Sequence, residues 1–296
     1  MSQDYRLMER DIQVILDVYK YRYLSVSQIT SLQFPSLQTA RRRLRVMTAD
    51  GYLEGFTASG TPESVYYVTR KGAEVVAAYL NVPVTSLKWV KSTRSPKDHY
   101  FLQHFLKTND FRIALAKACH ISNLQISLLG YIPEYYSEST GKSGAVKYIR
   151  DFICDVRDPA RLIHHTPDAV FALEKDGNPA LFFLEIDRGT EVVNDPEKGF
   201  LKSFHFYLNY FVDGKYQKYS EDFRCSPFKS FRTLFVTTSQ ERLDNMRRGA
   251  NGVYIDPPQV KRFIWLTTDD HIGRDSMFQP IWQSADINDK SLYKIG

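Results

Sequence analysis

The sequence predicts an α/β protein built from two parts, and three observations support this division. Three amphipathic helical segments and a short pair of β-type runs occupy residues 1–81. Two apolar runs rich in β-forming residues, Ala169–Leu173 and Ala180–Leu184, lie in the second half, with a charged, glycine-containing turn between them. Residues 82–97 contain two prolines and several serine, threonine and basic residues, which is typical of a linker.

The N-terminal part has the element order of a DNA-binding motif. Apolar periodicity and capping residues predict helices over 11–21, 27–34 and 37–50. A turn-rich segment between two β-type runs, over residues 52–68, predicts a hairpin, and a further helix follows to Leu80. Three helices followed by a hairpin predict a winged helix-turn-helix over residues 1–81, in which the third helix enters the major groove.

The excess of positive charge lies entirely in this part. The net charge is +5, and residues 1–100 hold 14 Lys/Arg against 9 Asp/Glu, whereas the remainder holds 25 of each. Such asymmetry favours a polyanionic partner over a merely solvated helix face. We therefore expect contacts to double-stranded DNA from basic residues of the third helix and of the helix after the hairpin. These are Arg41, Arg42, Arg43, Arg45, Arg70 and Lys71.

Residues 98–270 are predicted to form an α/β domain, and residues 271–296 an irregular tail. The first elements expected are a long helix over 98–120 and strands over 124–132 and 148–156, with a polar insertion over 135–146. The elements expected after the hairpin are a helix starting at Asp195, a strand, a helix and a last strand, over 195–211, 231–237, 239–248 and 261–267.

Acidic residues mark one end of the expected hairpin. Asp168 begins its first strand, and Glu185 and Asp187 close the second. Residues two apart in a strand point to the same face, so three carboxylates are expected to converge. Clustered acids need a cation, which could be Mg²⁺ or Mn²⁺ or a close Arg or Lys side chain. His164-His165 is near Asp168 and could bind substrate or shuttle protons, although paired histidines at a strand entry are more often structural.

The acids and the element order resemble the PD-(D/E)XK nuclease-like superfamily, whose core runs α-β-β-β-α-β. Its motif residues here would be Pro167-Asp168 and Glu185-x-Asp187. The resemblance implies phosphodiester hydrolysis, with Asp168 and Glu185 as ligands of Mg²⁺ or Mn²⁺ and Asp187 as a further catalytic acid. Active members usually carry lysine where this chain has Asp187. Lys202 on the next helix is the candidate replacement, and a surface lysine is the alternative reading.

A second resemblance covers most of the chain, roughly residues 7–270. The N-terminal winged helix, a histidine near the start of the long helix (His99 or His104), PDAVFAL and FFLEIDRGTE together resemble the replication-relaxation family. That family is found in plasmids and other mobile elements and is linked to plasmid replication or DNA relaxation. The resemblance implies an N-terminal winged helix followed by a PD-(D/E)XK nuclease-like domain.

Two functions remain open at this point. The chain is either a Mg²⁺-dependent DNA endonuclease or nickase, or a catalytically inactive regulator of transcription or replication whose second domain serves docking or dimerisation. The expected partners are DNA, a second copy of the chain, and replication or mobilisation proteins. A nicking relaxase would need a nucleophilic tyrosine and a His-x-His metal site, which does not occur. The candidate tyrosines are Tyr135-Tyr136 and the pair Tyr207 and Tyr210, for which packing in a loop or strand and in a helix, respectively, is the favoured reading.

Several other classes are disfavoured. Three dispersed cysteines suggest neither a zinc site nor a disulfide framework. No Walker A motif is present, so a nucleotide-driven motor is not expected. With no charged-then-apolar leader and no apolar run of spanning length, a cytoplasmic protein without a membrane partner is expected.

Overall fold

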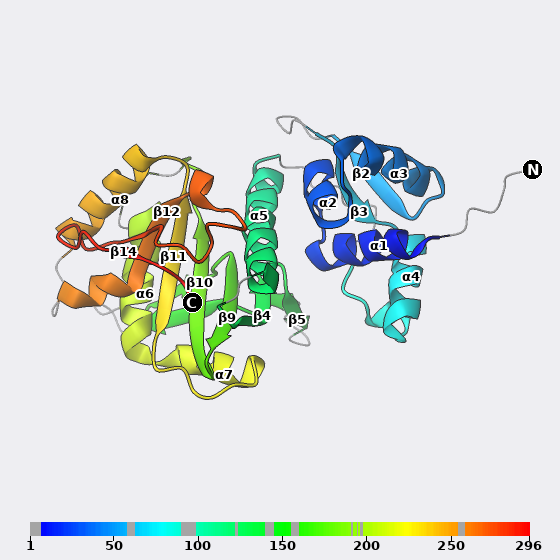
Figure 1. Ribbon diagram of the computed structural model, residues 1–296. Coiled ribbons are helices and arrows are strands. Elements are labelled where there is room, and N and C mark those ends of the chain that lie inside the picture. The colour runs from blue at the N-terminus through cyan, green and yellow to red at the C-terminus, as the bar shows by residue number, and fades with distance from the viewer. Residues whose placement is uncertain are drawn as a thin grey trace, which may run out of the picture. The chain divides into compact units, whose positions relative to one another are not determined.

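The computed structural model contains two compact units, residues 1–113 and 114–296. It describes residues 7–57, 63–89, 99–121, 124–139, 145–154, 160–190, 192–193, 195, 198–253 and 258–296. Helices and strands are mixed in both units, and the second holds a large mixed sheet (Figure 1). Residues 90–97 of the predicted linker lie outside the described residues. The division between the units falls within helix α5 (His99–Ile121), later than the linker.

The first unit contains the predicted helices and hairpin. Its helices are α1 (Glu9–Tyr21), α2 (Val26–Gln33), α3 (Leu37–Ala49) and α4 (Arg70–Leu80). Its strands are β1 (Leu24–Ser25), β2 (Leu53–Phe56) and β3 (Val65–Val68), which form an antiparallel sheet in the order β1-β3-β2. Side-chain oxygens of Ser25, Ser36 and Thr69 accept hydrogen bonds from backbone amides at the starts of α2, α3 and α4, which explains where these helices begin.

The first half of α5 belongs to this unit because polar side chains tie it to α1 and α2. The buried Asn109 amide nitrogen donates to the backbone oxygens of Tyr21 and Tyr23 at 3.1 and 2.8 Å. The Gln28 side-chain amide donates to Leu106 O at 2.8 Å and to Asp110 Oδ1 at 2.7 Å. Ile113 completes the apolar core of the unit. Sequence periodicity marks the helix but not these distant partners.

The second unit is organised around a seven-stranded mixed sheet in the order β14-β13-β12-β11-β10-β9-β4. Strand β10 runs parallel to β11, which runs parallel to β12, and the other neighbours are antiparallel. The strands are β4 (Ile126–Pro133), β9 (Ala169–Lys175), β10 (Asn178–Ile186), β11 (Phe231–Thr237), β12 (Ile264–Thr268), β13 (Trp282–Ser284) and β14 (Leu292–Tyr293).

Two helices, α6 (Gly199–Asp213) and α8 (Gln240–Gly252), lie on one face of this sheet (Figure 1). Phe204 and Tyr207 of α6 and Met246 of α8 share one buried cluster with Phe183 of β10 and Phe235 of β11. Because side chains alternate along a strand, a strand buried on both faces needs a continuous apolar run. This explains the uninterrupted apolar sequence of β9 and β10.

The polar segment between β4 and the hairpin forms two small antiparallel sheets. Strand β5 (Ser137–Ser139) pairs with β6 (Ala145–Lys147), although residues 140–144 between them lie outside the described residues. Strand β7 (Asp151–Cys154) pairs with β8 (Leu162–His165). The short helix α7 (Tyr219–Asp222) follows α6. Residues 135–146 were expected only to form an insertion, and the structure places strands within it.

Two expectations for the second unit were wrong. The helix expected to start at Asp195 begins at Gly199, with Lys198 as its N-cap. The segment 271–296, expected to be an irregular tail, adds β13 and β14 to the sheet. The buried Arg247 of α8 holds this segment through its guanidinium, which donates to the backbone oxygens of Ser284, Asp286 and Asp289 at 2.7 to 2.9 Å. Such tertiary hydrogen bonds leave no periodic signal in the sequence.

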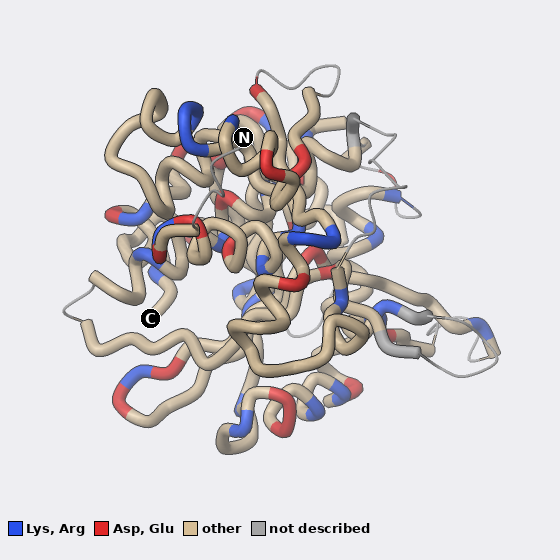
Figure 2. Tube along the Cα trace, turned by 90° about the vertical axis from the view of Figure 1, so that its right-hand side faces the viewer, with Lys and Arg blue, Asp and Glu red and all other residues tan. Residues whose placement is uncertain are grey.

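Charged residues of both signs are spread along the described chain (Figure 2). Within the described residues, no helix combines the length and the apolar character needed to cross a membrane.

The ion pair between Arg43 of α3 and Asp11 of α1 gives a first prediction. Asp11 is 1% exposed, and the Arg43 guanidinium pairs with both of its carboxylate oxygens. Arg43→Ala leaves a buried carboxylate without its cation, so we expect the free energy of unfolding of the first unit to fall by at least about 2 kcal/mol. Urea denaturation measures this, with the exposed Arg42→Ala as the matched control, expected within about 0.5 kcal/mol of wild type. Equal losses for the two variants would contradict it.

Candidate functional site

The hairpin of β9 and β10 sets the geometry of the site. The paired residues of the two strands run from Asn178 opposite Lys175 to Leu184 opposite Ala169. The two-residue turn Asp176-Gly177 joins Lys175 to Asn178 and closes the hairpin at that end. Both turn residues have positive φ, 50° and 72°, as the tight turns that match strand twist require. The open end therefore carries Asp168 and Glu185, as the sequence predicted.

Asp168 is held at this end by its backbone and by its side chain. Its amide donates to Leu184 O at 3.0 Å, and its backbone oxygen accepts from the amide of Glu134 at 2.9 Å. The carboxylate oxygen Oδ2 accepts from the buried amide of Ile186 at 2.6 Å. Asp168 is only 9% exposed. Its orientation is therefore set by the pairing of β9 with both neighbouring strands.

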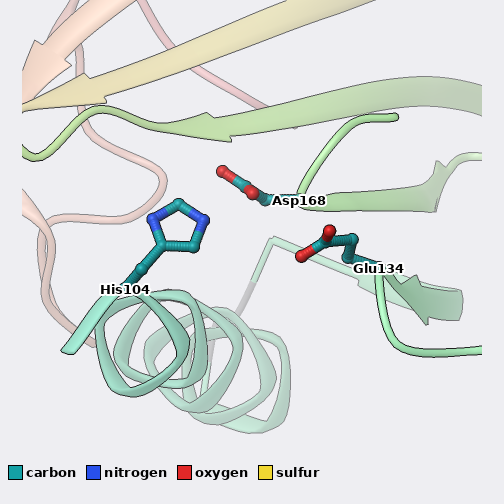
Figure 3. A group of neighbouring side chains, drawn as sticks. All are labelled: His104, Glu134 and Asp168. Atoms are coloured by element: carbon teal, nitrogen blue, oxygen red, sulfur yellow. The ribbon is translucent and has the colours of Figure 1, made fainter. Parts of the chain in front are cut away.

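A second carboxylate, Glu134, lies beside Asp168 where β4 ends (Figure 3). Oxygens of the two side chains are within 4.8 Å of each other. The Lys147 ammonium at the end of β6 forms an ion pair with Glu134 Oε1. Burial lowers the pKa of Lys147, the charge of Asp168 opposes that shift, and Arg150 adds to it. Figure 3 also draws His104, which lies in the part of α5 that belongs to the first unit.

Glu185 is buried near Asp168 and is oriented by two hydrogen-bond partners. Its Oε1 lies 2.6 Å from His165 Nε2 of β8 and accepts a hydrogen bond from the Tyr207 hydroxyl of α6. Burial raises the pKa of Glu185, and the charge of Asp168 contributes to the increase, while His165 and Tyr207 oppose it. Burial also raises the pKa of Tyr207, and the Glu185 carboxylate adds to that shift. Both groups are thus pushed towards their neutral forms.

Asp187 is placed differently from the other acids. Its amide donates to Val236 O at 2.8 Å, which extends the pairing of β10 with β11. Its carboxylate accepts two hydrogen bonds from the Arg242 guanidinium of α8, one of them at 2.8 Å, and a third from Thr237 Oγ1 at 2.6 Å. Asp187 therefore has the close arginine partner that the sequence offered as the alternative to a metal ion. Arg242 is near Asp187 because strand β11, which is parallel to β10, leads directly into α8.

Lys202 is exposed on α6 and lines a groove together with Arg161 and His164. Lys147, at the end of β6, is the lysine that pairs with Glu134. It directly follows the segment expected to be a polar insertion, and neither Lys147 nor Glu134 belongs to a local motif. His165 has a sequence signal, because the histidine pair precedes Asp168.

Two of the four candidate tyrosines for a relaxase have structural roles in this chain. Tyr207 and Tyr210 are fully buried. The Tyr207 hydroxyl donates to Glu185, and the Tyr210 hydroxyl donates to Asp151 Oδ2 at 2.6 Å. A nucleophile must reach its substrate, so neither residue has the exposure that strand transfer requires.

The basic residues of the first unit divide into two groups. Arg41, Arg42 and Arg45 are exposed on α3, and a groove of about 660 Å³ between α3 and the hairpin β2–β3 is lined by Arg41 and Arg45. Arg43 is bound to Asp11 and supports the fold.

The two basic residues at the start of α4 also have partners. Lys71 Nζ donates to Asp50 O at 2.8 Å, at the end of α3, and lies over the Tyr52 ring. Arg70 pairs with Glu74 at 3.4 Å on an exposed face. We expect Lys71 to act mainly as a cap for α3.

Residues 16–224 match the family model described as Replication-relaxation. The chain belongs to the replication-relaxation family. The match covers the Arg-rich helix α3, the hairpin β9–β10 and helix α6, and it includes Glu134, Asp168, Glu185 and Asp187. Among curated proteins, no match is found.

A comparison of folds finds a structure of the restriction endonuclease FokI bound to DNA. The sequences are 9% identical, the TM-score is 0.26, and the match covers 92% of this chain and 45% of that chain. The chain thus spans less than half of the length of that enzyme, and a TM-score this low carries no argument about function.

The bidentate pair of Asp187 with Arg242 gives a prediction for this replication-relaxation protein. Both side chains are mostly buried, 13% and 16% exposed. Asp187→Asn and Arg242→Met should each lower the free energy of unfolding by about 2–4 kcal/mol, and the double variant should lose less than the sum. A double-mutant cycle in urea measures the coupling, expected at about 1–3 kcal/mol. Additive losses would show that the pair is not formed.

Proposed function

We propose that the protein binds double-stranded DNA of a plasmid or other mobile element through its first unit and nicks or cleaves it at a divalent-cation site in its second unit. The observation that carries this proposal is the approach of Glu134 to Asp168, with Lys147 paired to Glu134. Membership of the replication-relaxation family supports a role in replication or relaxation of such DNA. A carboxylate pair beside a lysine is suited to phosphodiester chemistry.

The element order supports a PD-(D/E)XK assignment for the nuclease-like part. Helix α5, strands β4, β9 and β10, helix α6 and strand β11 occur in the α-β-β-β-α-β order, with strands β5 to β8 between β4 and β9 and the short helix α7 between α6 and β11. Asp168 and Glu185 occupy the motif positions at the open end of the central hairpin. We assign Asp187 a structural role instead, because Arg242 and Thr237 engage its carboxylate.

The donor set fits Mg²⁺ or Mn²⁺. Carboxylate oxygens are the ligands these hard cations prefer, and Glu134 and Asp168 offer them within 4.8 Å. A bound cation of this kind would lower the pKa of its water and offset negative charge on the scissile phosphate. We therefore assign Glu134 and Asp168 as ligands, with Glu185 as the third acid of the site.

The remaining side chains have roles that follow from their contacts. Lys147 supplies a positive charge next to Glu134 and Asp168. Asp187, which stands where active nucleases usually carry lysine, cannot supply this charge. We propose that its ammonium contacts the scissile phosphate or the attacking water. Tyr207 and His165 hold the Glu185 carboxylate in one orientation from α6 and β8. They act as positioning residues.

For DNA binding we propose a winged helix in the first unit. Helices α1, α2 and α3 are followed by the β2–β3 hairpin, which is the order of that motif. Arg41, Arg42 and Arg45 project from α3 as exposed side chains. We propose that they contact phosphates or base edges, and that α3 enters the major groove.

Nicking of supercoiled plasmid tests the catalytic part. Wild type with Mg²⁺ or Mn²⁺ should convert plasmid to the open circle or linear form, and EDTA should abolish this conversion. Asp168→Asn, Glu134→Gln and Lys147→Met should each slow it by at least about 100-fold, because each removes a ligand or the positive charge of the site. The matched control is Glu174→Gln, an acid at the closed end of the same hairpin, which should cleave like wild type.

Equal conversion by wild type and all three site variants would contradict the nuclease assignment. Duplex binding without any metal-dependent conversion would favour the second candidate function, a regulator whose nuclease-like unit is catalytically silent. The ion pair between Asp187 and Arg242 is the observation that favours this second candidate.

Duplex binding measured against salt concentration tests the DNA-binding part. Arg41→Ala with Arg45→Ala should weaken binding and reduce the salt slope by about 1.8, because each lost phosphate contact accounts for about 0.9. The control pair Arg248→Ala with Lys290→Ala removes two exposed cations from the second unit. If the two double variants have the same affinity and slope, α3 is not the DNA contact.

A further inference from the structure

A groove of about 350 Å³ lies between helix α6 and the β7–β8 hairpin in the second unit. Nitrogen-bearing side chains surround it, and none of the described residues that line it is acidic. These side chains belong to Arg150, Arg161, His164, Lys202, His205 and Asn209. Arg150, Arg161 and Lys202 are exposed. Residues 101–296 hold 25 acidic and 25 basic residues, so the basic lining of the groove is a local separation of charge.

The walls of the groove are fixed by the fold. Ile153 of β7 pairs with Ile163 of β8, and both line the groove together with Phe206 of α6. Ile153 and Phe206 are each 2% exposed and belong to the core of the second unit. The basic side chains therefore project from a well-packed base.

An exposed aromatic ring neighbours His164, one of the lining residues. Phe152 of β7 is 40% exposed, and its ring centroid lies 5.9 Å from that of His164. Lys215 Nζ lies 4.3 Å from the centroid of the Phe152 ring and pairs with Asp213 at 2.7 Å. Basic grooves with exposed aromatic rings are the combination that proteins use to bind single-stranded nucleic acid, because the ring stacks on a base while cations contact phosphates.

The groove adjoins the acid site through shared elements. His164 lines the groove, and the next residue, His165, contacts Glu185. Phe206 lines the groove, and the next residue, Tyr207, donates to the same carboxylate. The rings of His165 and Phe206 are 4.9 Å apart and form the wall between the two sites. Arg150 is also close enough to Lys147 to affect its pKa.

We propose that this groove binds the phosphate backbone of a single DNA strand next to the acid site, with Phe152 and His164 stacking on a base. A volume near the lower end of the range for ligand sites, about 300–1,000 Å³, admits one or two nucleotide units and excludes a duplex. The inference rests on the proposed function, since it assigns the strand to DNA handled at that site. It also gives Lys202 a role in substrate binding in place of the catalytic role expected from the sequence.

Binding of a labelled oligothymidylate of about 12 nucleotides, a length within the usual site sizes, tests this proposal by fluorescence anisotropy in EDTA. The full chain carrying Arg41→Ala and Arg45→Ala serves as the reference, so that the first unit contributes little. Adding Arg161→Ala and Lys202→Ala should weaken binding by at least about tenfold, because two charge-assisted contacts are lost. The salt slope should fall by about 1.4, at about 0.7 per contact on single strands.

Three further variants sharpen the result. Arg248→Ala with Lys290→Ala, added to the same reference, changes the net charge equally and should leave affinity unchanged. Lys202→Arg keeps the charge and should bind within about twofold of the reference. Phe152→Leu keeps an apolar side chain but removes the ring, and should weaken binding by about fivefold or more. Equal affinities for the groove variant and the charge control would overturn the proposal.

Competition distinguishes a strand from a free phosphate ligand. Thymidine monophosphate and inorganic phosphate should displace the oligonucleotide only at concentrations at least about 100-fold higher than unlabelled oligothymidylate, because they offer one contact set in place of several. Equal potency of the mononucleotide would overturn the assignment to a strand. Because the binding test is done in EDTA, its result does not depend on the proposed catalysis. The groove can bind DNA in a protein that never cleaves it. Plasmid nicking can also occur in groove variants that no longer bind the oligonucleotide.

Discussion

The hydrogen bond from the Ile186 amide to the Asp168 carboxylate is the interaction on which the site depends. It joins the start of β9 to the end of β10, and it is buried. The backbone oxygen of Asp168 accepts a hydrogen bond from the Glu134 amide, which fixes the end of β4. Three neighbouring strands are thereby held in register at one point. Glu134, Asp168 and Glu185 approach one another because of this register, and not because they are close in the sequence.

Each acid around this point has a partner that offsets the cost of burying it. Lys147 pairs with Glu134, His165 and Tyr207 hydrogen-bond Glu185, and Arg242 binds Asp187. The partners differ in kind, and so do the roles we assign. Arg242 engages both oxygens of Asp187 and makes it structural. The Lys147 side chain is 47% exposed, so its ammonium can be displaced from Glu134 by a cation or a phosphate.

Much of the fold could be predicted from the sequence because its signals are local. Apolar periodicity located α1 to α4, and the apolar runs around Asp176-Gly177 located the hairpin that carries Asp168 and Glu185. What failed depends on distant contacts. Lys147 reaches Glu134 across the small β5–β6 sheet, Arg247 holds β13 in the main sheet, and Arg43 pairs with Asp11 of another helix. The choice of Lys202 followed helix spacing, and it stays a prediction.

The central claim is that Glu134 and Asp168 form a divalent-cation site, and titration calorimetry with Mn²⁺ tests it most directly. The account predicts one site per chain in the wild type, its loss in Asp168→Asn and Glu134→Gln, and unchanged binding in the hairpin control Glu174→Gln. Lys147→Met should bind Mn²⁺ at least as tightly as wild type, because it removes the ammonium that competes for Glu134. Equal Mn²⁺ binding by wild type, Asp168→Asn and Glu134→Gln would contradict the account.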